Sequence, residues 1–280
     1  MPVFPFGFPK LHRRRFLQTA SLAICGPAWS FTSSEASSHA DSQAPAPASL
    51  PLPPSFPTQP PELIHEIVMV SHFDLKRVQQ LVEARPSLAR AAWDWGFGDW
   101  ESALGAASHM GNRPIAEYLL AKGARPSIFS AAMFGQLDVV KAFVTAQPGV
   151  QRTRGPHSIA LLAHAKAGGP AASAVYDYLA SLGDAGNDPP TPLTQSDLDA
   201  IVGNYPFSPD ENDHIIVSAE KGSVTWARAA SMGRPLFHRG NRVFNPAGAE
   251  AVRIAFTTGP TGTRMTIHDP DAVLSVIRRS

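Results

Sequence analysis

The chain of 280 residues is long enough for two small domains with tails, and its hydrophobic fraction of 44% is ordinary for a folded protein. Its net charge is +1. Residues 1–40 hold four basic residues and one acid, and the remainder holds 20 basic against 22 acidic residues, so this remainder lacks the basic excess of a nucleic-acid-binding protein. The single cysteine, Cys25, excludes a disulfide framework and a zinc site built from cysteines.

Residues 1–40 contain a pattern typical of an export signal. Arg13 and Arg14 are followed, after one further residue, by Phe16 and Leu17, and a moderately apolar run follows. This resembles the twin-arginine (Tat) signal, which addresses folded proteins for export across a bacterial inner membrane. The run is shorter than the roughly 20 apolar residues that span a bilayer. We therefore expect a signal peptide over 1–40 and a periplasmic or secreted mature protein without a transmembrane span.

Two alternatives stay open for this leader. It can be the cationic tail of a cytosolic protein, or Cys25 can be lipidated, although the residue before it, Ile24, is larger than lipoprotein signals normally carry. Eight prolines follow within residues 41–61, among small and polar residues. Such a composition cannot bury a core, so this segment is predicted to be a disordered linker.

Residues 62–183 contain four segments with a shared pattern: a helix of small residues, a turn, an aliphatic helix, and a Gly or Pro stop. The best copy runs Ser102–Gly111 and then Asn112–Ala124, and the others lie around 67–82, 131–148 and 155–183. This pattern resembles the ankyrin repeat, whose stacked helix pairs bind other macromolecules. The resemblance implies a protein partner and an ankyrin-type α-solenoid of about four irregular repeats. Together with the β domain expected after it, this gives a fold of the α+β multidomain class.

The segment 93–101 combines four large aromatics with three acids and two glycines, a composition typical of binding hot spots. We expect it to form a partner-binding finger, helped by the first helices of the repeats. In the alternative, its aromatics fold back onto the first helix pair, with Trp93 and Trp100 more buried than Trp95 and Phe97. The candidate partner-binding residues are Trp93, Asp94, Trp95, Phe97, Asp99, Trp100, Glu101, Ser108, His109, Met133 and Phe134.

Residues 184–193 are predicted to be a linker, and residues 194–280 a β domain. Thr194 is expected to cap a short helix over 196–202, after which the hydrophobic pattern alternates. We expect strands over 214–219, 223–228, 236–238, 242–245, 251–257, 263–268 and 273–278, forming a small antiparallel meander or half-barrel. The opening Leu198-x3-Val202-Gly203-x-Tyr205 resembles the small β domain appended to β-lactamase-like and penicillin-binding-type serine hydrolases, where it is accessory to catalysis.

No pattern in the sequence indicates catalysis. Ser218-Ala219-Glu220-Lys221 matches Ser-x-x-Lys but runs off a strand instead of opening a helix. His65 and His72 can share a helix face but lack an evident third ligand, and His109 and His157 are interpreted as structural hydrogen-bonding residues. We therefore expect no catalytic residue, metal or cofactor, and an exported, non-enzymatic adaptor that binds a protein. The alternative is a binder of a small apolar ligand or cell-wall fragment in the β domain, with the repeats as scaffold, and a third possibility is an unrecognised hydrolase.

Overall fold

The computed structural model describes residues 51–52, 54–187, 191–228, 231 and 233–279. The predicted signal residues Arg13, Arg14, Phe16 and Leu17, Cys25, and most of the predicted linker over 41–61 lie outside these ranges. Leu52–Ser280 forms one compact unit, which contains all the helices and strands described below. None of the helices in the described ranges is long and apolar enough to cross a membrane.

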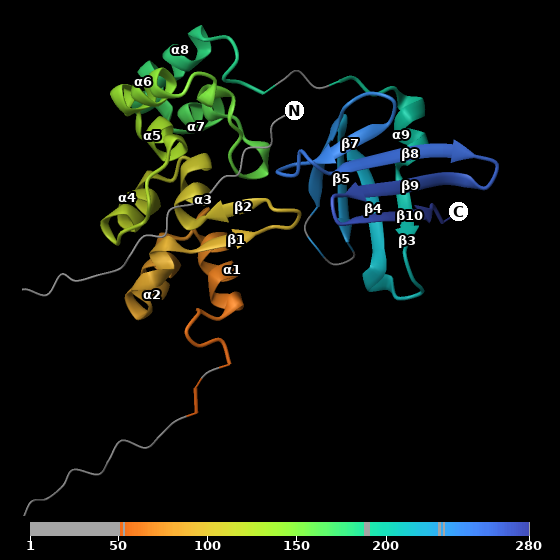
Figure 1. The fold of residues 1–280 in the computed structure, drawn as a ribbon, viewed down its shortest axis with the longest axis horizontal. Helices are drawn as coiled ribbons and strands as arrows, with labels where there is room; N and C mark the ends of the chain where they lie inside the picture. Colours follow the sequence, from red (N-terminus) through yellow and green to blue (C-terminus); the bar gives the residue numbers. More distant parts are fainter. Residues whose placement is uncertain (1–50, 53, 188–190, 229–230, 232, 280) are drawn as a thin grey trace, which may run out of the picture. The chain divides into compact units, whose positions relative to one another are not determined.

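Eight short helices occupy the first half of the described unit (Figure 1). They pair in chain order, α1 with α2, α3 with α4, α5 with α6 and α7 with α8. Single-turn 3-10 helices interrupt the connections between them. The bounds are α1 Pro61–Val70, α2 Leu75–Ala84, η1 Pro86–Arg90, α3 Ala103–His109, α4 Arg113–Ala121, α5 Ile128–Phe134, α6 Leu137–Ala146, η2 Val150–Arg152, η3 Pro156–Ser158, α7 Leu161–Ala167, η4 Gly169–Ala172 and α8 Ser173–Ser181.

Glycines allow the tight turn in the second and third pairs. Gly111 and Gly135 have φ of 68° and 75°, in the left-handed region that favours glycine. A Cβ at either position would lie 2.1 Å from a backbone carbonyl oxygen, of Ala167 and Ala171 respectively. The small residues of this part of the sequence therefore let neighbouring backbones approach closely. On α4, Ile115 and Leu119 are fully buried.

A two-stranded hairpin, β1 (Ala92–Asp94) with β2 (Trp100–Ser102), lies between the first two helix pairs. Its register pairs Trp93 with Glu101, and Trp93 and Trp95 pack against the core cluster formed by α1 to α4. Trp100 is 63% exposed. Trp93 and Trp95 thus fold back onto the helices, as in the alternative given for these aromatics. The expectation in that alternative that Trp100 is more buried than Trp95 is wrong.

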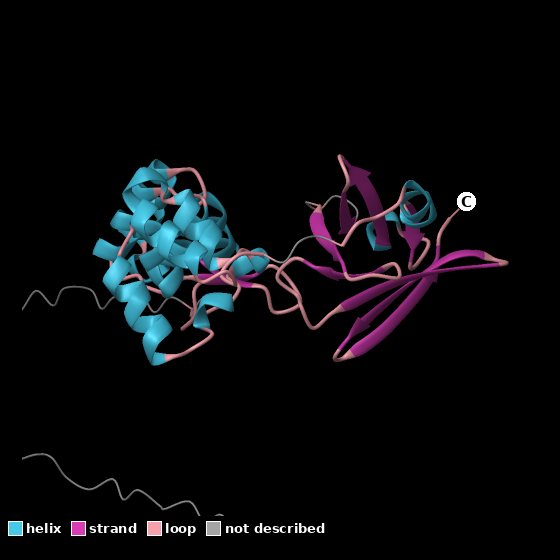
Figure 2. Ribbon diagram, turned by 90° about the horizontal axis from the view of Figure 1, so that it is seen from above, coloured by secondary structure: helices cyan, strands magenta, loops and turns pink. Residues whose placement is uncertain are grey.

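The second half of the unit is an antiparallel sheet that follows a short helix, α9 (Gln195–Ile201) (Figure 2). Thr194 caps α9 in a capping box with Asp197, which confirms the expected helix start. The strands are β3 Gly203–Pro206, β4 His214–Glu220 (after η5 Glu211–Asp213), β5 Ser223–Arg228, β6 Arg234–His238, β7 Val243–Pro246, β8 Arg253–Gly259, β9 Gly262–Asp269 and β10 Ala272–Ile277.

The eight strands pair in the sequential order β10-β9-β8-β7-β6-β5-β4-β3. The two ends of this order also meet, because the backbone N–H of Arg279, just after β10, donates to the carbonyl of Asn204 in β3 at 2.8 Å. Tyr205, Phe244, Ile254 and Met265 fill the interior and are fully buried. Near-closure leaves few free strand edges.

The predicted fold class, an ankyrin-type solenoid followed by a small meander or half-barrel, is wrong. The described residues form nine helices and a large, nearly closed, barrel-like sheet of eight antiparallel strands. The seven expected strands exist, but Gly203–Pro206 adds an eighth that brings the sheet ends together. In the helical half, connections that contain glycine and proline form 3-10 turns, as at Pro156 and Gly169. These turns make the helix pairs differ from one another, so the pairs do not form a regular solenoid.

Candidate metal centre

The hairpin directs two acidic side chains into the protein. Glu101 lies on β2, and Asp99 precedes the strand by one residue; they are 0% and 3% exposed. Trp100 lies between them and points the opposite way, as the alternation of side chains along a strand requires. A fully buried carboxylate needs charged or hydrogen-bonding partners, since burying it alone is very costly.

Three histidines from separate segments surround Glu101. His72 follows α1, His109 is the last residue of α3, and His157 lies in η3. Their Nε2 atoms lie 3.5, 2.9 and 3.4 Å from the Glu101 carboxylate oxygens, in that order. One ligand atom from each of the four residues lies within 4.8 Å of all the others.

The far sides of two of the rings are held by acceptors. His72 Nδ1 lies 2.9 Å from the carbonyl oxygen of Met69, and His157 Nδ1 lies 2.8 Å from Asp99 Oδ2. An acceptor of this kind places the proton on Nδ1, so in the neutral ring Nε2 presents its lone pair toward Glu101. Metal-binding histidines typically have this outer hydrogen bond to a carbonyl or carboxylate.

Both oxygens of the Glu101 carboxylate have close polar neighbours. Trp95 Nε1 donates to Oε2 at 2.8 Å. Oε1 lies 2.9 Å from His109 Nε2, and both atoms are buried, without a hydrogen bond of good geometry to any described residue. A buried carboxylate that faces three imidazole nitrogens is a donor set that one metal ion can share.

The turn that carries His157 has a backbone conformation that ordinary residues rarely adopt. His157 and Ser158 have φ of 58° and 59°. Each such residue costs on the order of 1–3 kcal/mol and persists only where surrounding contacts enforce it. Asp99 supplies such contacts, because its Oδ1 accepts from the His157 backbone N–H at 2.9 Å while its Oδ2 faces the ring. The histidine is thus fixed through its backbone and its ring.

The cluster is strongly polarised. Burial alone would raise the pKa of Glu101, but His109 and His157 beside it lower that pKa to about 2. Burial acts against the charged form of His157, yet Asp99 and Glu101 raise its pKa to about 9. Asp99 also has a lowered pKa, because hydrogen bonds from His157 and the charge of Arg234 outweigh its burial. Glu101 is therefore ionised, and a metal ion binding here would displace a proton from His157.

The donor set fits a borderline transition metal. Tetrahedral zinc with nitrogen or oxygen ligands at about 2.0–2.1 Å places those atoms about 3.3–3.4 Å apart, close to the separations of 2.9–3.5 Å between the Glu101 oxygens and the three Nε2 atoms. Three imidazoles with one carboxylate suit Zn²⁺, Cu²⁺, Ni²⁺ or Fe²⁺, whereas Ca²⁺ and Mg²⁺ prefer oxygen ligands alone.

Most of the other predicted partner-binding residues are buried or contact other residues of this chain, so they do not form an exposed binding surface. Ser108 and Met133 are fully buried in the helical core, and Phe134 is half-buried beneath the Arg113 guanidinium. Asp94 accepts from the Gly96 backbone N–H. Phe97, 38% exposed, stacks on Trp226 of β5 with ring centroids 5.8 Å apart. The segment 93–101 therefore contacts other parts of its own chain.

The convergence of these residues is not visible in the sequence. The sequence predicts His109 to be structural or partner-binding and His157 to be structural. It pairs His72 only with His65, whose ring instead packs edge-on against Trp93 and Trp95, with centroids 5.0 and 5.3 Å away. The spacing of the four ligands along the chain matches no local metal-binding motif. The sequence feature that points toward the site is weak: the acidic residues at the end of the aromatic segment 93–101.

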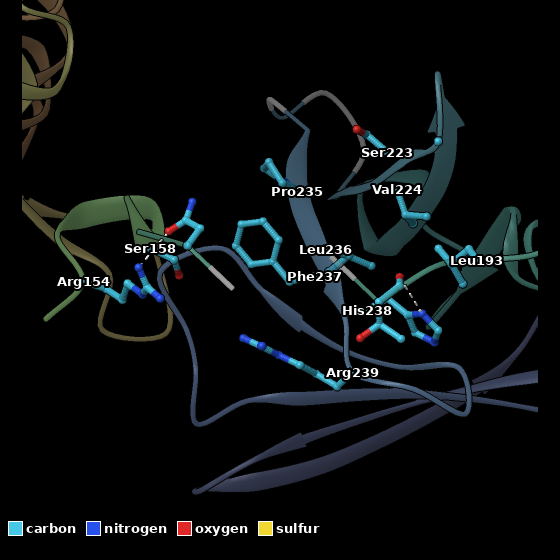
Figure 3. Close-up of a pocket in the computed structure, with 13 residues that line it drawn as sticks. Arg154, Ser158, Leu193, Ser223, Val224, Pro235, Leu236, Phe237, His238 and Arg239 are labelled. Carbon is cyan, nitrogen blue, oxygen red and sulfur yellow. Dashed lines mark hydrogen bonds between the residues drawn. The ribbon is translucent and has the colours of Figure 1, made fainter. Parts of the chain in front are cut away.

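A separate cavity of about 320 Å³ lies against the sheet (Figure 3). Its lining combines apolar side chains such as Val224 and Phe237 with Arg154, His238 and Arg239. The Nε2 atom of His238 is buried without a hydrogen-bond partner among the described residues. This volume is at the lower end of small-molecule sites. The sequence-based alternative of a small ligand in the β domain would use this cavity, and it stays a prediction.

Comparisons of this chain with protein-family models, with curated proteins and with solved structures find no match. The resemblances to ankyrin repeats, to a Tat signal and to appended β domains accordingly stay predictions from the sequence. The function proposed below depends on the side chains clustered around Glu101.

Proposed function

We propose that this protein binds one divalent transition-metal ion, with Zn²⁺ the first candidate, through His72, Glu101, His109 and His157. The observation that carries the proposal is the convergence of four ligand atoms, each within 4.8 Å of the others, around the fully buried carboxylate of Glu101. A metal ion at this point would be shared by the carboxylate and the three imidazoles.

The metal has a structural role in this proposal. All four ligands come from the protein, as in structural zinc sites, and their side chains are mostly buried, with exposures of 0% for Glu101, 8% for His109, 17% for His72 and 29% for His157. The ligands belong to four segments: the turn after α1, the hairpin, the end of α3, and η3. One ion would tie these segments together and stabilise the fold, because metal binding to a site absent from the unfolded chain adds to folding free energy.

Metal content measured on the full chain tests this proposal. The purified protein is stripped with a chelator, dialysed against buffered Zn²⁺, and analysed for bound metal by mass spectrometry. We expect one Zn²⁺ per chain, and strong loss of retention in Glu101→Gln, which keeps the shape of the side chain, and in His109→Ala. His65→Ala removes a neighbouring ring outside the cluster and should retain the metal. No stoichiometric zinc, or equal retention in all variants, would refute the proposal.

Protein binding, the function expected from the sequence, is a second candidate. Val139 and Phe143 on α6 are 42% and 43% exposed and lie four residues apart, hence on one helix face, and Trp100 is 63% exposed. These apolar side chains support an adaptor role through surfaces away from the buried cluster. Cross-linking in a periplasmic extract tests it, because Phe143→Glu should abolish a specific cross-link that the unmodified chain forms.

A further inference from the structure

The sheet contributes a side chain to the surroundings of the metal cluster. Arg234, the first residue of β6, lies with Nη2 2.7 Å from Asp99 Oδ2, the oxygen that also faces His157. Its Nη1 donates to the Gly96 carbonyl in the hairpin at 3.2 Å. Asp99 is 3% exposed, so this ion pair is shielded from solvent. The position of His157 therefore depends on a residue of the sheet.

A second contact joins the same two parts of the chain. Ser158, directly after His157, accepts from the backbone N–H of Gly248 at 2.7 Å, and its hydroxyl donates to Glu250. Gly248 follows β7 and also presses against Asp99, since a Cβ there would lie 2.1 Å from the carboxyl carbon. The sheet therefore also fixes the turn that carries His157, through its contacts with Ser158.

From these contacts we infer that the sheet regulates the metal site: docking of β6 and of the turn after β7 onto Asp99 and Ser158 sets the affinity for the metal, and the metal in turn strengthens that docking. The inference rests on the proposed metal site. Arg234 acts as a positioning residue through Asp99, with no contact to the ion.

Thermodynamic linkage makes this effect reciprocal. If a docked sheet orients His157 for the metal, the bound metal must favour the docked sheet by the same factor. Removing an outer partner of a metal-binding histidine typically weakens affinity 10- to 100-fold. Asp99 is that partner of His157, and Arg234→Ala removes the ion pair that holds Asp99, so it should lower zinc affinity by up to about that factor although every ligand is retained.

Zinc affinity in competition with a chromogenic chelator, measured on the full chain, provides the first test. We expect binding weaker by up to about 10- to 100-fold in Arg234→Ala and partial recovery in Arg234→Lys, which keeps the charge. Arg242→Ala is the matched control, because Arg242 makes a similar 2.8 Å ion pair with Asp197, outside the metal cluster. The visible spectrum of bound Co²⁺ should change in Arg234→Ala, since altered ligand orientation alters that spectrum whereas simple destabilisation does not.

Hydrogen exchange tests the reciprocal effect. Zinc added to the metal-free chain should slow exchange of the Gly248 amide, which donates to Ser158, and should have no such effect in His109→Ala. Equal zinc affinity in Arg234→Ala and the unmodified chain, or unchanged exchange at Gly248, would overturn the coupling and leave the metal site standing. Failure of the unmodified chain to bind zinc would overturn both.

Discussion

Thermal unfolding with and without zinc isolates the contribution of a single ligand. In His109→Ala the ring nitrogen 2.9 Å from Glu101 Oε1 is lost, and with it one of four donors. Truncating this side chain also costs packing energy in the metal-free protein. Comparing each variant with itself, with and without zinc, removes that cost from the result, so the shift in Tm reports metal binding alone.

The size of the shift follows from mass action. Free zinc at 100 times Kd stabilises the folded state by about 2.7 kcal/mol, and each kcal/mol raises the Tm of a chain of this size by about 2–4 °C. The unmodified chain should therefore gain about 5–11 °C. If His109→Ala binds 100-fold more weakly, the same zinc contributes only about 0.4 kcal/mol, a shift of about 1–2 °C.

Differential scanning fluorimetry of the metal-free proteins, at a fixed zinc activity set by a metal buffer, is the assay. His65→Ala serves as the control, because His65 packs against two tryptophans and should keep the full shift. An equal shift in His109→Ala and the unmodified chain would refute the assignment of His109 as a ligand.

Two further predictions concern contacts near the cluster. Gly248→Ala should lower the free energy of unfolding by about 2–4 kcal/mol in urea titrations, because it adds a Cβ against Asp99 to the cost of a positive φ. Gly222→Ala, with a similar φ but nothing within 4 Å, should cost only about 1–2 kcal/mol, and equal losses would contradict the close contact. Phe97→Ala should lose about 1–2 kcal/mol and shift the fluorescence of Trp226, on which the ring stacks; an unchanged spectrum would argue against that stacking.

Local features of this chain were predictable, and long-range ones were not. The capping box at Thr194 and the alternation along β5 and β9 each depend on neighbouring residues, so the sequence indicates this helix and these strands. Closure of the sheet depends on Arg279 meeting Asn204, far apart along the chain. Sequence periodicity carries no information about such a pairing, which explains why a small half-barrel was expected.

The candidate site likewise combines a local feature that the sequence shows with long-range contacts that it does not show. The segment 93–101 stood out by composition, but aromatics and acids suit a binding surface and a buried cluster equally well. Only the fold shows that Glu101 points inward and that Trp95 donates to it. His72 and His157 join it from distant segments, and their ring orientations depend on Met69 and Asp99, which no motif links to them.

X-ray absorption at the zinc edge of the loaded full chain tests the central claim most directly. The account predicts one zinc in a shell of about four nitrogen and oxygen atoms at about 2.0–2.1 Å, with multiple scattering from three imidazole rings and no sulfur. A shell of water oxygens without imidazole scattering would contradict it, because the metal would then lie outside the cluster formed by His72, Glu101, His109 and His157.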